Sequence, residues 1–323
     1  MLYFKLPFDE KIYSTDENSE NQNIQFHSFD QKEQVSFRGK IIEIDSENFE
    51  NIRFSSKNLL QESCNFEAET ETEYIEKLEN LIQIIKENKL PKVVLSRRKI
   101  FKDFKDINLK ASFENLCTMY PNAFRYIFSN GEISWMGAFS EVLGKYNKAN
   151  NSFETMSLAG TIPVNETWTT KEIEEQKPVS LYIRNVLKNY SDLVEESETH
   201  DHISGNIKHL RTDFKAIIER SDLEKIISEL HPTPAVCGIP KEFCKEIISN
   251  IEKFPRELYA GYIKIETEDF IYFFVNLRCA KLYKNAVHAF VGGGITAESN
   301  PQKEWRETEL KSEAILKNLV ILP

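Results

Sequence analysis

The segment from residue 261 to residue 296 reads GYIKIETEDFIYFFVNLRCAKLYKNAVHAFVGGGIT, and it decides the fold class. Three apolar runs, at 262–267, 270–283 and 286–291, are separated by Glu268-Asp269 and by Lys284-Asn285. Runs rich in β-branched and aromatic residues predict strands, and the polar pairs between them predict turns. We therefore expect an antiparallel meander in this segment.

Residues 70–90 carry the pattern of an amphipathic helix. Thr70 and Glu73 have the spacing of a capping box, in which each side chain bonds the other residue's backbone N–H. Apolar residues then recur every three to four positions, which predicts one buried face. Other helices are expected at 179–188 with Pro178 in the first turn, from Ser221 with Glu224 as a second capping box, from Pro240, and from Ser299 to about Leu319.

Short strands account for much of the remaining chain. The segment KVVLSR (92–97) is β-branched, residues 1–70 hold short alternating runs, and 124–135 is a hairpin pattern in which Asn130-Gly131 suits a type I′ turn. Together these elements predict an α+β fold, a large antiparallel β-sheet system covered by helices. We expect a single domain over residues 1–323, with 1–70 as its N-terminal part.

The charge balance is acidic. The chain has 51 acidic and 41 basic side chains, a net charge of −10 at pH 7, whereas a general nucleic-acid binder would need a basic face. We therefore expect no nucleic-acid partner. The short basic run Arg97-Arg98-Lys99 is expected at a solvated strand edge.

The cysteines and the apolar stretches predict the compartment. Five widely spaced cysteines without a CxxC pair are typical of reduced thiols in a cytosolic protein: Cys64, Cys117, Cys237, Cys244 and Cys279. The first residues lack the pattern of a secretory signal, and the strongly apolar stretch 270–275 is far shorter than the roughly 20 residues that span a bilayer. A soluble, cytoplasmic protein without a membrane partner is expected.

The C-terminal helix places charged residues on its inner face. At about 100° per residue, Glu304, Glu307 and Lys311 share a sector of about 60°, while Glu309 falls on the opposite, solvent-facing side. Burying unpaired carboxylates costs several kcal/mol each, so a cation is expected to meet them. The alternative is a Glu–Lys pair at the edge of a surface helix, worth a few tenths of a kcal/mol.

A second pair of carboxylates has the same spacing. Glu172 and Glu175 lie three residues apart within KEIEEQ (171–176), where a helix begins. Two such pairs on separate helices could converge on one hard cation, and oxygen-only ligands favour Mg²⁺. A solvated charged face is the alternative interpretation of this run.

Two further motifs are ambiguous. The glycines Gly292, Gly293 and Gly294 lie between a predicted strand and the last helix, where their N–H groups could approach an anion or could merely form a tight turn. His200-Asp201-His202 has no third ligand at useful spacing, and we interpret it as a solvated loop.

The chain resembles the chorismate-utilising enzymes, and among them the isochorismate synthases, over residues 73–319. The motifs that carry the resemblance occur in the family's order: KVVLSR (92–97), MGAFSE (136–141), SLAGT (157–161), KEIEEQ (171–176), HLRT (209–212), LHPTPAVCG (230–238), RELYAG (256–261), NLR (276–278), and GGGI (292–295) followed by EWRETELK (304–311).

The resemblance implies a Mg²⁺-dependent isomerase that converts chorismate to isochorismate. In such enzymes water adds at C2 while the C4 hydroxyl departs and the double bonds rearrange. By position, Lys92 looks like the general base and Glu141 like the general acid. A protonated glutamate needs an apolar pocket that raises its pKa, and Trp135, Met136 and Phe139 could supply one. Without the other motifs, a strand-edge lysine and a loop carboxylate would be the simpler interpretations.

The resemblance also assigns ligands. Glu175 and Glu307 look like direct Mg²⁺ ligands, with Glu172 and Glu304 in supporting or water-bridged positions. The expected substrate-binding residues are Ala159, Gly160, Thr161, His231, Arg278, Gly292, Gly293, Gly294 and Lys311. For His231 two roles stay open, a hydrogen bond near the ring oxygen or only shaping of the pocket.

Four positions depart from the family pattern. Gln176 replaces the histidine usual after the metal-binding glutamate, and Pro178 is unusual nearby. Ser140 stands where a proline commonly precedes the acid, and Glu257 replaces a frequent glycine. The first two put the geometry around Glu175 in question.

The branch within the family rests on few residues. Aminodeoxychorismate synthases often carry a lysine nucleophile where this chain has Ala159, and anthranilate synthases typically depend on a glutamine amidotransferase, which is not expected here. Salicylate synthase, which makes isochorismate and then eliminates pyruvate, stays open. So does a chorismate-binding module without turnover, supported by Gln176 and Pro178. We expect a monomeric isochorismate synthase that feeds menaquinone or siderophore biosynthesis.

Overall fold

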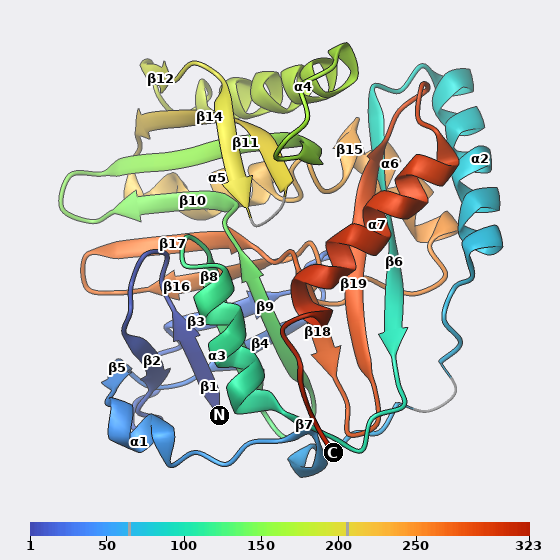
Figure 1. Ribbon diagram of the computed structural model, residues 1–323. Coiled ribbons are helices and arrows are strands. Elements are labelled where there is room, and N and C mark those ends of the chain that lie inside the picture. The colour runs from blue at the N-terminus through green and yellow to red at the C-terminus, as the bar shows by residue number, and fades with distance from the viewer. Residues whose placement is uncertain (64–65, 205–206) are drawn as a thin grey trace.

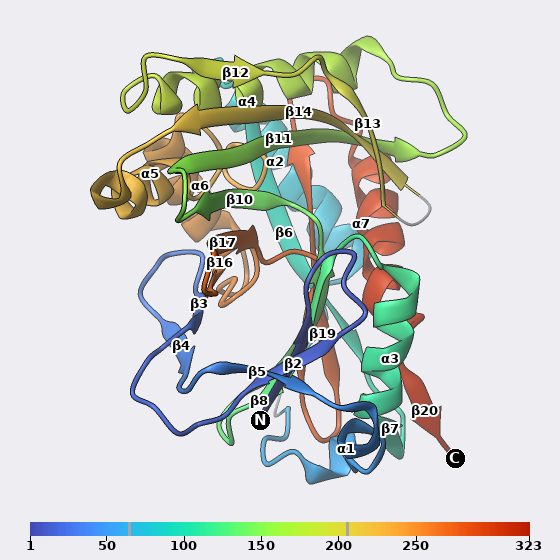
Figure 2. The same ribbon diagram turned by 90° about the vertical axis from the view of Figure 1, so that its left-hand side faces the viewer.

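The computed structural model describes residues 1–63, 66–204 and 207–323. Within these residues the chain forms two antiparallel sheets of nine strands each (Figure 1). The strands of one sheet run roughly across those of the other, and helices cover the outer faces (Figures 1 and 2). The predicted α+β architecture of large antiparallel sheets covered by helices is confirmed.

The first sheet has the order β15-β6-β19-β18-β9-β8-β1-β2-β5. Its strands come from every third of the chain, so the sheet joins distant segments. The bounds are β1 (Leu2–Lys5), β2 (Ile12–Thr15), β5 (Ile41–Ile44), β6 (Lys92–Phe101), β8 (Phe124–Ser129), β9 (Ser134–Phe139), β15 (Gly238–Ile239), β18 (Cys279–Leu282) and β19 (Val287–Ile295).

The second sheet has the order β12-β14-β11-β10-β17-β16-β3-β4, and β13 also pairs with β14. The bounds are β3 (Ile24–His27), β4 (Gln34–Phe37), β10 (Val142–Asn147), β11 (Ser152–Pro163), β12 (Val194–Glu196), β13 (His200–Ser204), β14 (Ile207–Ile217), β16 (Tyr262–Glu266) and β17 (Phe270–Val275). A separate pair joins β7 (Asp106–Asn108) to β20 (Val320–Leu322). The short strands expected in residues 1–70 are present and divide between the two large sheets.

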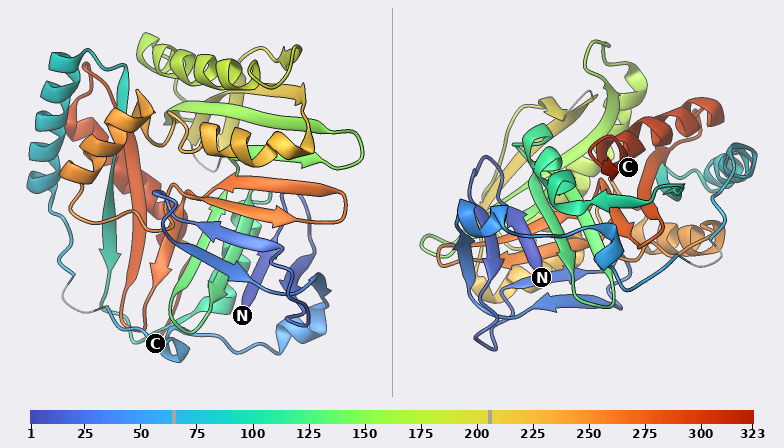
Figure 3. Two further views of the ribbon diagram at one scale, coloured as in Figure 1. Left: turned by 180° about the vertical axis from the view of Figure 1, so that it is seen from behind. Right: turned by 60° about the horizontal axis from the view of Figure 1, so that its bottom comes forward.

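The helices lie on three sides of the sheets. Helices α2 and α7 pack side by side over β6 and β19, α4 covers β11 and β14, and α5 and α6 lie on the side seen from behind in Figure 3. The bounds are α1 (Ser46–Glu50), α2 (Glu71–Asn88), α3 (Leu109–Met119), α4 (Thr170–Leu187), α5 (Leu223–Leu230), α6 (Lys241–Ile251) and α7 (Pro301–Leu316), with short 3-10 turns at Ser56–Asn58 and Arg220–Asp222.

Three of the predicted helices begin where local sequence signals place them. Thr70 and Glu73 form a reciprocal capping box at the start of α2. Helix α6 begins directly after Pro240, and the side chain of Asn300 caps α7, which ends at Leu316. Capping contacts are local, so sequence reveals them without knowledge of the rest of the fold.

Two helix predictions are wrong in detail. Helix α4 begins at Thr170 and not at Val179, so Pro178 lies in its interior. A proline there removes one backbone hydrogen bond, but Val179 and Ile183 are fully buried and anchor the helix on both turns that follow. The predicted capping box of Ser221 with Glu224 does not form, because Glu224 instead pairs with Lys264 at 2.6 Å.

The predicted meander is broken in the middle of its longest run. Residues 270–283 form two strands, β17 and β18, which belong to different sheets. The chain crosses between the sheets at Asn276-Leu277-Arg278, where Arg278 has a positive φ of 43°. This crossing lies beside the cavity described below.

The hairpin of β8 and β9 is present, but its turn differs from the prediction. Ser129 pairs with Ser134, which leaves a four-residue loop at 130–133 in place of a two-residue type I′ turn. The side chain of Asn130 accepts hydrogen bonds from the backbone N–H groups of Glu132 and Ile133, and these bonds stabilise the longer loop.

The two arginines of the basic run on β6 are buried and Lys99 is partly exposed, so the prediction of a solvated edge is wrong. Arg97 is 5% exposed and its guanidinium lies 3.8 Å from the centre of the Trp305 ring. Arg98 is 4% exposed and pairs with Glu257 at 2.9 Å. Because β6 lies between β15 and β19, no local sequence pattern could show that its arginines have partners.

Two other predictions concern loops and thiols. His200, Asp201 and His202 lie on β13 and not in a loop. Cys117, Cys237, Cys244 and Cys279 are free, as expected, and Cys64 lies outside the described residues. In the described part of the chain, no helix combines the length and the apolar character needed to cross a membrane.

Candidate active site

A cavity lies where the two sheets meet, between α4 and α7. Its lining comes from β6, β11, β14, β19, both helices and the segments that follow β9 and β17. Every predicted site residue lines it except His231 and Glu304: Lys92, Glu141, Ala159, Gly160, Thr161, Glu172, Glu175, Arg278, Gly292, Gly293, Gly294, Glu307 and Lys311. Residues that are distant in sequence therefore meet in one place.

Lys92 and Glu175 form a buried ion pair on one wall of this cavity. Lys92 is the first residue of β6 and is 3% exposed, and its Nζ lies 2.6 Å from Oε1 of Glu175 on α4. Gly294 of β19 faces this pair. A Cβ at Gly294 would lie 2.6 Å from the same Glu175 oxygen, so glycine is needed to admit both side chains.

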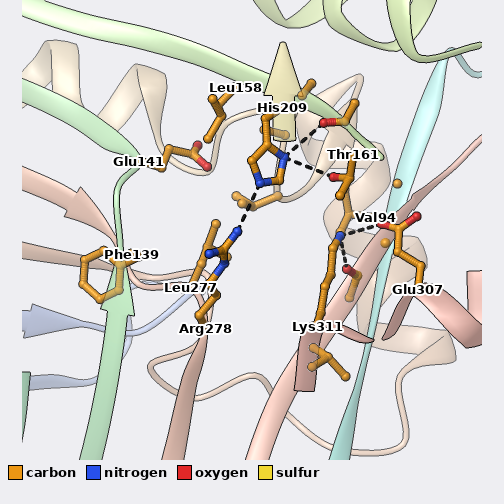
Figure 4. Close-up of a pocket in the computed structure, with 18 of the residues that line it drawn as sticks. Val94, Phe139, Glu141, Leu158, Thr161, His209, Leu277, Arg278, Glu307 and Lys311 are labelled. Carbon is orange, nitrogen blue, oxygen red and sulfur yellow. Dashed lines mark hydrogen bonds and ion pairs between the residues drawn. The ribbon is translucent and has the colours of Figure 1, made fainter. Parts of the chain in front are cut away.

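A second ion pair lies beside the first. Lys311 Nζ is 2.6 Å from Oε1 of Glu307, one turn earlier on α7, and also donates to the carbonyl of Gly292 at 2.9 Å (Figure 4). Glu304 is 2% exposed, and its Oε2 would lie 3.3 Å from a Cβ at Gly293. The inner face of α7 is thus the one that the helical wheel predicts.

Glu309 is only partly exposed and not fully solvent-facing as predicted, because it pairs with Arg97 and with Lys99 of β6. Of the two interpretations of the glycine run, the tight turn is excluded: Gly292, Gly293 and Gly294 lie inside β19, opposite 94–96 of β6. Gly293 and Gly294 leave room for carboxylate and lysine side chains, and Gly292 leaves room for the Tyr259 hydroxyl.

The four glutamates differ in how they are held. Glu172 caps its own helix, because one of its oxygens accepts from the backbone N–H and the hydroxyl of Thr169. Glu175 and Glu307 reach the cavity from different helices and each contacts a lysine. Among the residues described, no three His, Cys, Asp or Glu side chains are close enough to form a metal centre as they stand.

The donor set nevertheless fits a hard cation. All candidate ligands are carboxylate oxygens. Glu304 and Glu307 approach Gly293, and Glu175 approaches the adjacent Gly294, and the missing Cβ atoms of these glycines keep that space open. Mg²⁺ prefers a few carboxylates together with water and an anionic ligand. One or two glutamates with a substrate carboxylate would meet that preference.

Glu141 occupies the opposite side of the cavity. It follows β9, is 4% exposed, and is approached by the Thr233 hydroxyl at 3.5 Å. Burial raises the pKa of Glu141 to about 7, and the positive charge of Lys92 opposes that shift. Phe139 and Leu158 lie near it in Figure 4. The predicted neighbours Trp135 and Met136 do not line the cavity: the Trp135 ring stacks on Phe290.

His209 is a residue of the cavity to which the sequence assigned no role. Its Nε2 lies 3.2 Å from Nη2 of Arg278, and its Nδ1 lies 3.0 Å from the carbonyl of Gly160 and 3.2 Å from the Thr161 hydroxyl (Figure 4). A guanidinium only donates, so Nε2 accepts and Nδ1–H donates to Gly160. Burial and Arg278 hold the pKa of His209 well below its ordinary value, in agreement with a neutral ring.

The tyrosine of the RELYAG motif was also missed. Tyr259 lines the cavity, and its hydroxyl would lie 2.9 Å from a Cβ at Gly292. Both His209 and Tyr259 lie within the quoted motifs, but neither has a charge or a spacing that marks it as part of a site.

His231 is not among the residues that line the cavity, which favours the second of its two expected roles, shaping of the pocket. Its side chain is buried, with Nε2 3.1 Å from the carbonyl of Ala260 and Nδ1 3.2 Å from the amide nitrogen of Gln31. Both ring nitrogens are therefore used within the protein. The neighbouring Ala235 and Val236 line the cavity, so this motif shapes its wall.

Comparison with known proteins identifies the fold and the family. Residues 16–320 match the family described as "Chorismate binding enzyme". Isochorismate synthase MenF of Escherichia coli (strain K12) is 26% identical over 263 residues, 76% of this chain and 59% of that relative, so the chain spans about three fifths of its length. Isochorismate synthase EntC of the same organism is 40% identical over 111 residues, 33% of this chain and 28% of that protein. The solved structure of the menaquinone-specific isochorismate synthase MenF from Escherichia coli superposes with a TM-score of 0.82 at 19% identity, over 98% of this chain and 88% of that one.

Proposed function

The chain belongs to the family of chorismate-binding enzymes, and from this premise we propose that it is an isochorismate synthase. The reaction converts chorismate to isochorismate by addition of water at C2 and departure of the C4 hydroxyl. The observation that carries the proposal is that the buried side chains of Lys92 and Glu141 line one cavity. The pKa of the Glu141 carboxyl group is raised to about 7. An amine and a protonated acid are the two groups that this chemistry needs.

The two proton transfers balance over one turnover. In its ion pair with Glu175, Lys92 is an ammonium group, so it first gives up that proton. As the neutral amine it then removes a proton from water while the water oxygen bonds to C2. The ring double bonds shift, the C4–O bond breaks, and Glu141 gives its proton to the departing oxygen, which leaves as water. One proton enters Lys92 and one leaves Glu141, so return of a proton from the lysine to the glutamate restores the starting state.

The raised pKa of Glu141 supports its role as the acid. A carboxyl group with an ordinary pKa would be ionised at neutral pH and could not protonate the leaving oxygen. Glu141 makes a polar side-chain contact with the Thr233 hydroxyl at 3.5 Å, and burial is the main cause of its raised pKa. Position and protonation state therefore agree.

The charged groups on the other wall suit the carboxylates of chorismate. Arg278 offers a two-pronged contact, and His209 orients it by accepting from Nη2. Lys311 is held by Glu307 and by the Gly292 carbonyl, which fixes its ammonium at the edge of the cavity. We propose Glu175 and Glu307 as ligands of a Mg²⁺ ion, with Glu172 and Glu304 supporting them. When bound there, the ion would supply a Lewis-acid contact to the ring carboxylate.

The departure at position 176 is compatible with this assignment. Gln176 is 3% exposed, and its Nε2 donates to the hydroxyl of Ser157 at 2.7 Å. Ser157 also contacts Ser180 at 2.8 Å, so α4 is tied to β11 directly behind Glu175. The amide thus anchors the helix that carries the proposed ligand.

The test is a product assay with the purified chain alone. Chorismate and Mg²⁺ are added, and the products are resolved by chromatography. Isochorismate as the main product supports the proposal, and a chelator is expected to abolish turnover. Salicylate with pyruvate as the main products would assign the chain to the salicylate branch instead. Binding of chorismate in titration calorimetry without any product would indicate a binding module and contradict the proposal.

A further inference from the structure

Ser140 places a hydroxyl in the cavity directly before the proposed acid. It lines the same wall as Glu141 and follows the last residue of β9. A serine stands here where the family pattern commonly has a proline, which has no hydroxyl. A new polar group beside a reacting residue is a candidate contact for the substrate.

The Ser140 hydroxyl is held by a histidine from the second sheet. Its Oγ lies 2.9 Å from Nε2 of His202 on β13. His202 lies directly opposite His209 in the β13–β14 ladder, so the two rings project from the same face of the sheet. The His209 ring holds Arg278, and the His202 ring holds Ser140.

The direction of the hydrogen bond follows from the next partner. Nδ1 of His202 lies 3.5 Å from Nη1 of Arg211, whose Nε donates to Oδ1 of Asp213 at 2.8 Å. Because a guanidinium only donates, Nδ1 of His202 accepts, and its Nε2 carries the hydrogen that is donated to Ser140. Burial, together with Arg211 and Arg278, lowers the pKa of His202 to about 4, so the ring is neutral near pH 7.

The Ser140 oxygen therefore acts as an acceptor toward His202, and its own hydrogen is left for another acceptor. In the part of the chain that the structure describes, no protein acceptor for that hydrogen is found. The hydroxyl lines the cavity, where a bound ligand would supply oxygens. We propose that Ser140 donates a hydrogen bond to a substrate oxygen at the Glu141 end of the cavity, and that His202 is its positioning residue. This inference rests on the proposed function.

The experiment is a double-mutant cycle on chorismate turnover. Ser140→Ala, His202→Phe and the double variant are compared with the wild type in kcat, KM and kcat/KM, and chorismate affinity is measured by calorimetry. Ser140→Thr keeps the hydroxyl. Ser134→Ala is the matched control, because Ser134 lies on β9, the strand that Ser140 follows, and donates to the Ser129 hydroxyl at 2.8 Å, outside the cavity.

The expected pattern separates positioning from general damage. Ser140→Ala lowers kcat/KM by about 5- to 10-fold, as expected for loss of one neutral hydrogen bond, and Ser140→Thr restores most of it. His202→Phe lowers kcat/KM by about 3-fold, and the double variant is no worse than Ser140→Ala, because His202 acts through the hydroxyl. Ser134→Ala stays at the wild-type value.

Other outcomes overturn the inference. Wild-type kcat/KM for Ser140→Ala, or losses that multiply in the double variant, would show that the hydroxyl does not contact the substrate or that His202 acts independently. If the wild type makes no isochorismate, the proposed function fails, and calorimetry alone then decides: weaker chorismate binding by Ser140→Ala supports the contact, whereas equal binding, or none by the wild type, rejects it.

Discussion

The cavity has two ends that use the same residue type in opposite electrostatic settings. At the paired end, defined by Lys92, Glu175, Glu307 and Lys311, each carboxylate lies 2.6 Å from an ammonium group. At the acid end, Glu141 has a hydroxyl at 3.5 Å and an apolar wall, and burial raises its pKa to about 7. The difference shows that surroundings, and not residue type, decide which carboxyl group keeps a proton.

The two ends therefore divide the proposed work. The glutamates at the paired end would repel an anionic substrate, so a cation, either a lysine or a metal ion, must lie between them and the substrate. A protonated glutamate at the acid end can give its proton to a leaving group.

The largest effect is expected from the proton-transfer groups. Glu141→Gln and Lys92→Ala each should lower kcat by about 10²- to 10⁴-fold, because each removes one of the two proton transfers. Chorismate binding, measured by calorimetry, should be largely retained. Glu132→Gln, in the exposed β8–β9 loop, is the control and should keep wild-type turnover. Near-normal kcat for either variant would show that the assignment of base or acid is wrong.

The second effect concerns stability and pH. The pKa of Glu141 rises from its ordinary value of 4.5 to about 7 in the folded state. The contribution of Glu141 to the wild-type free energy of unfolding should therefore be largest below pH 4.5. It should fall as the pH rises toward 7, because the carboxyl group of Glu141 ionises more easily in the unfolded state than in the folded state. Glu141→Gln should lack this fall, which is on the order of 3 kcal/mol. Denaturant unfolding from pH 4 to pH 8 measures it, and parallel curves for both proteins would contradict the raised pKa.

The same shift predicts that kcat/KM declines above about pH 7.

The third effect separates two glutamates on α7. Glu307→Gln should lower kcat/KM by roughly 10- to 100-fold and weaken the dependence on Mg²⁺, because a proposed ligand is lost. Glu309→Gln should leave turnover unchanged but lower the free energy of unfolding by about 1 to 2 kcal/mol, since Arg97 is buried and loses its carboxylate partner. Mg²⁺ titrations of turnover and urea unfolding of both variants provide the test. If Glu307→Gln lowered only the free energy of unfolding and Glu309→Gln lowered turnover, the paired end would have a role in stability and not in catalysis.

The smallest effect is expected from added volume at the paired end. A methyl group at Gly294 would clash with Cε of Lys92 and lie 2.6 Å from the Glu175 oxygen, so both side chains of the ion pair would have to move. Gly294→Ala should lower kcat by about 10-fold at most, since the flexible side chains can partly adjust. Gly293→Ala meets Glu304 only at 3.3 Å and should cost less. Equal kcat for both variants and the wild type would show that the glycines are not needed for the site.

Sequence predicts the local parts of this molecule and the inner face of α7. The capping box of Thr70 with Glu73 depends only on neighbours within one turn, and so does the helical wheel that places Glu304 and Glu307 on one face. Both predictions agree with the structure. The family motifs predict most of the residues that line the cavity. The order of the motifs along the chain identifies the family, which the spacing of residues within one motif does not.

Sequence fails where a distant partner decides the outcome. Arg97 and Arg98 look like a solvated edge, but Trp305 and Glu257 come from far along the chain to cover them. The glycine run is expected after the end of a strand, although pairing with β6 places it inside β19. His231 looks like a site residue, yet Gln31 and Ala260 occupy both its nitrogens.

The most direct test of the central claim follows the water oxygen. The purified chain is incubated with chorismate and Mg²⁺ in water enriched in oxygen-18, and the product is analysed by mass spectrometry with fragmentation. The account predicts isochorismate that carries one oxygen-18 atom, located at the C2 hydroxyl. Isochorismate without the label, or the absence of isochorismate, would contradict it.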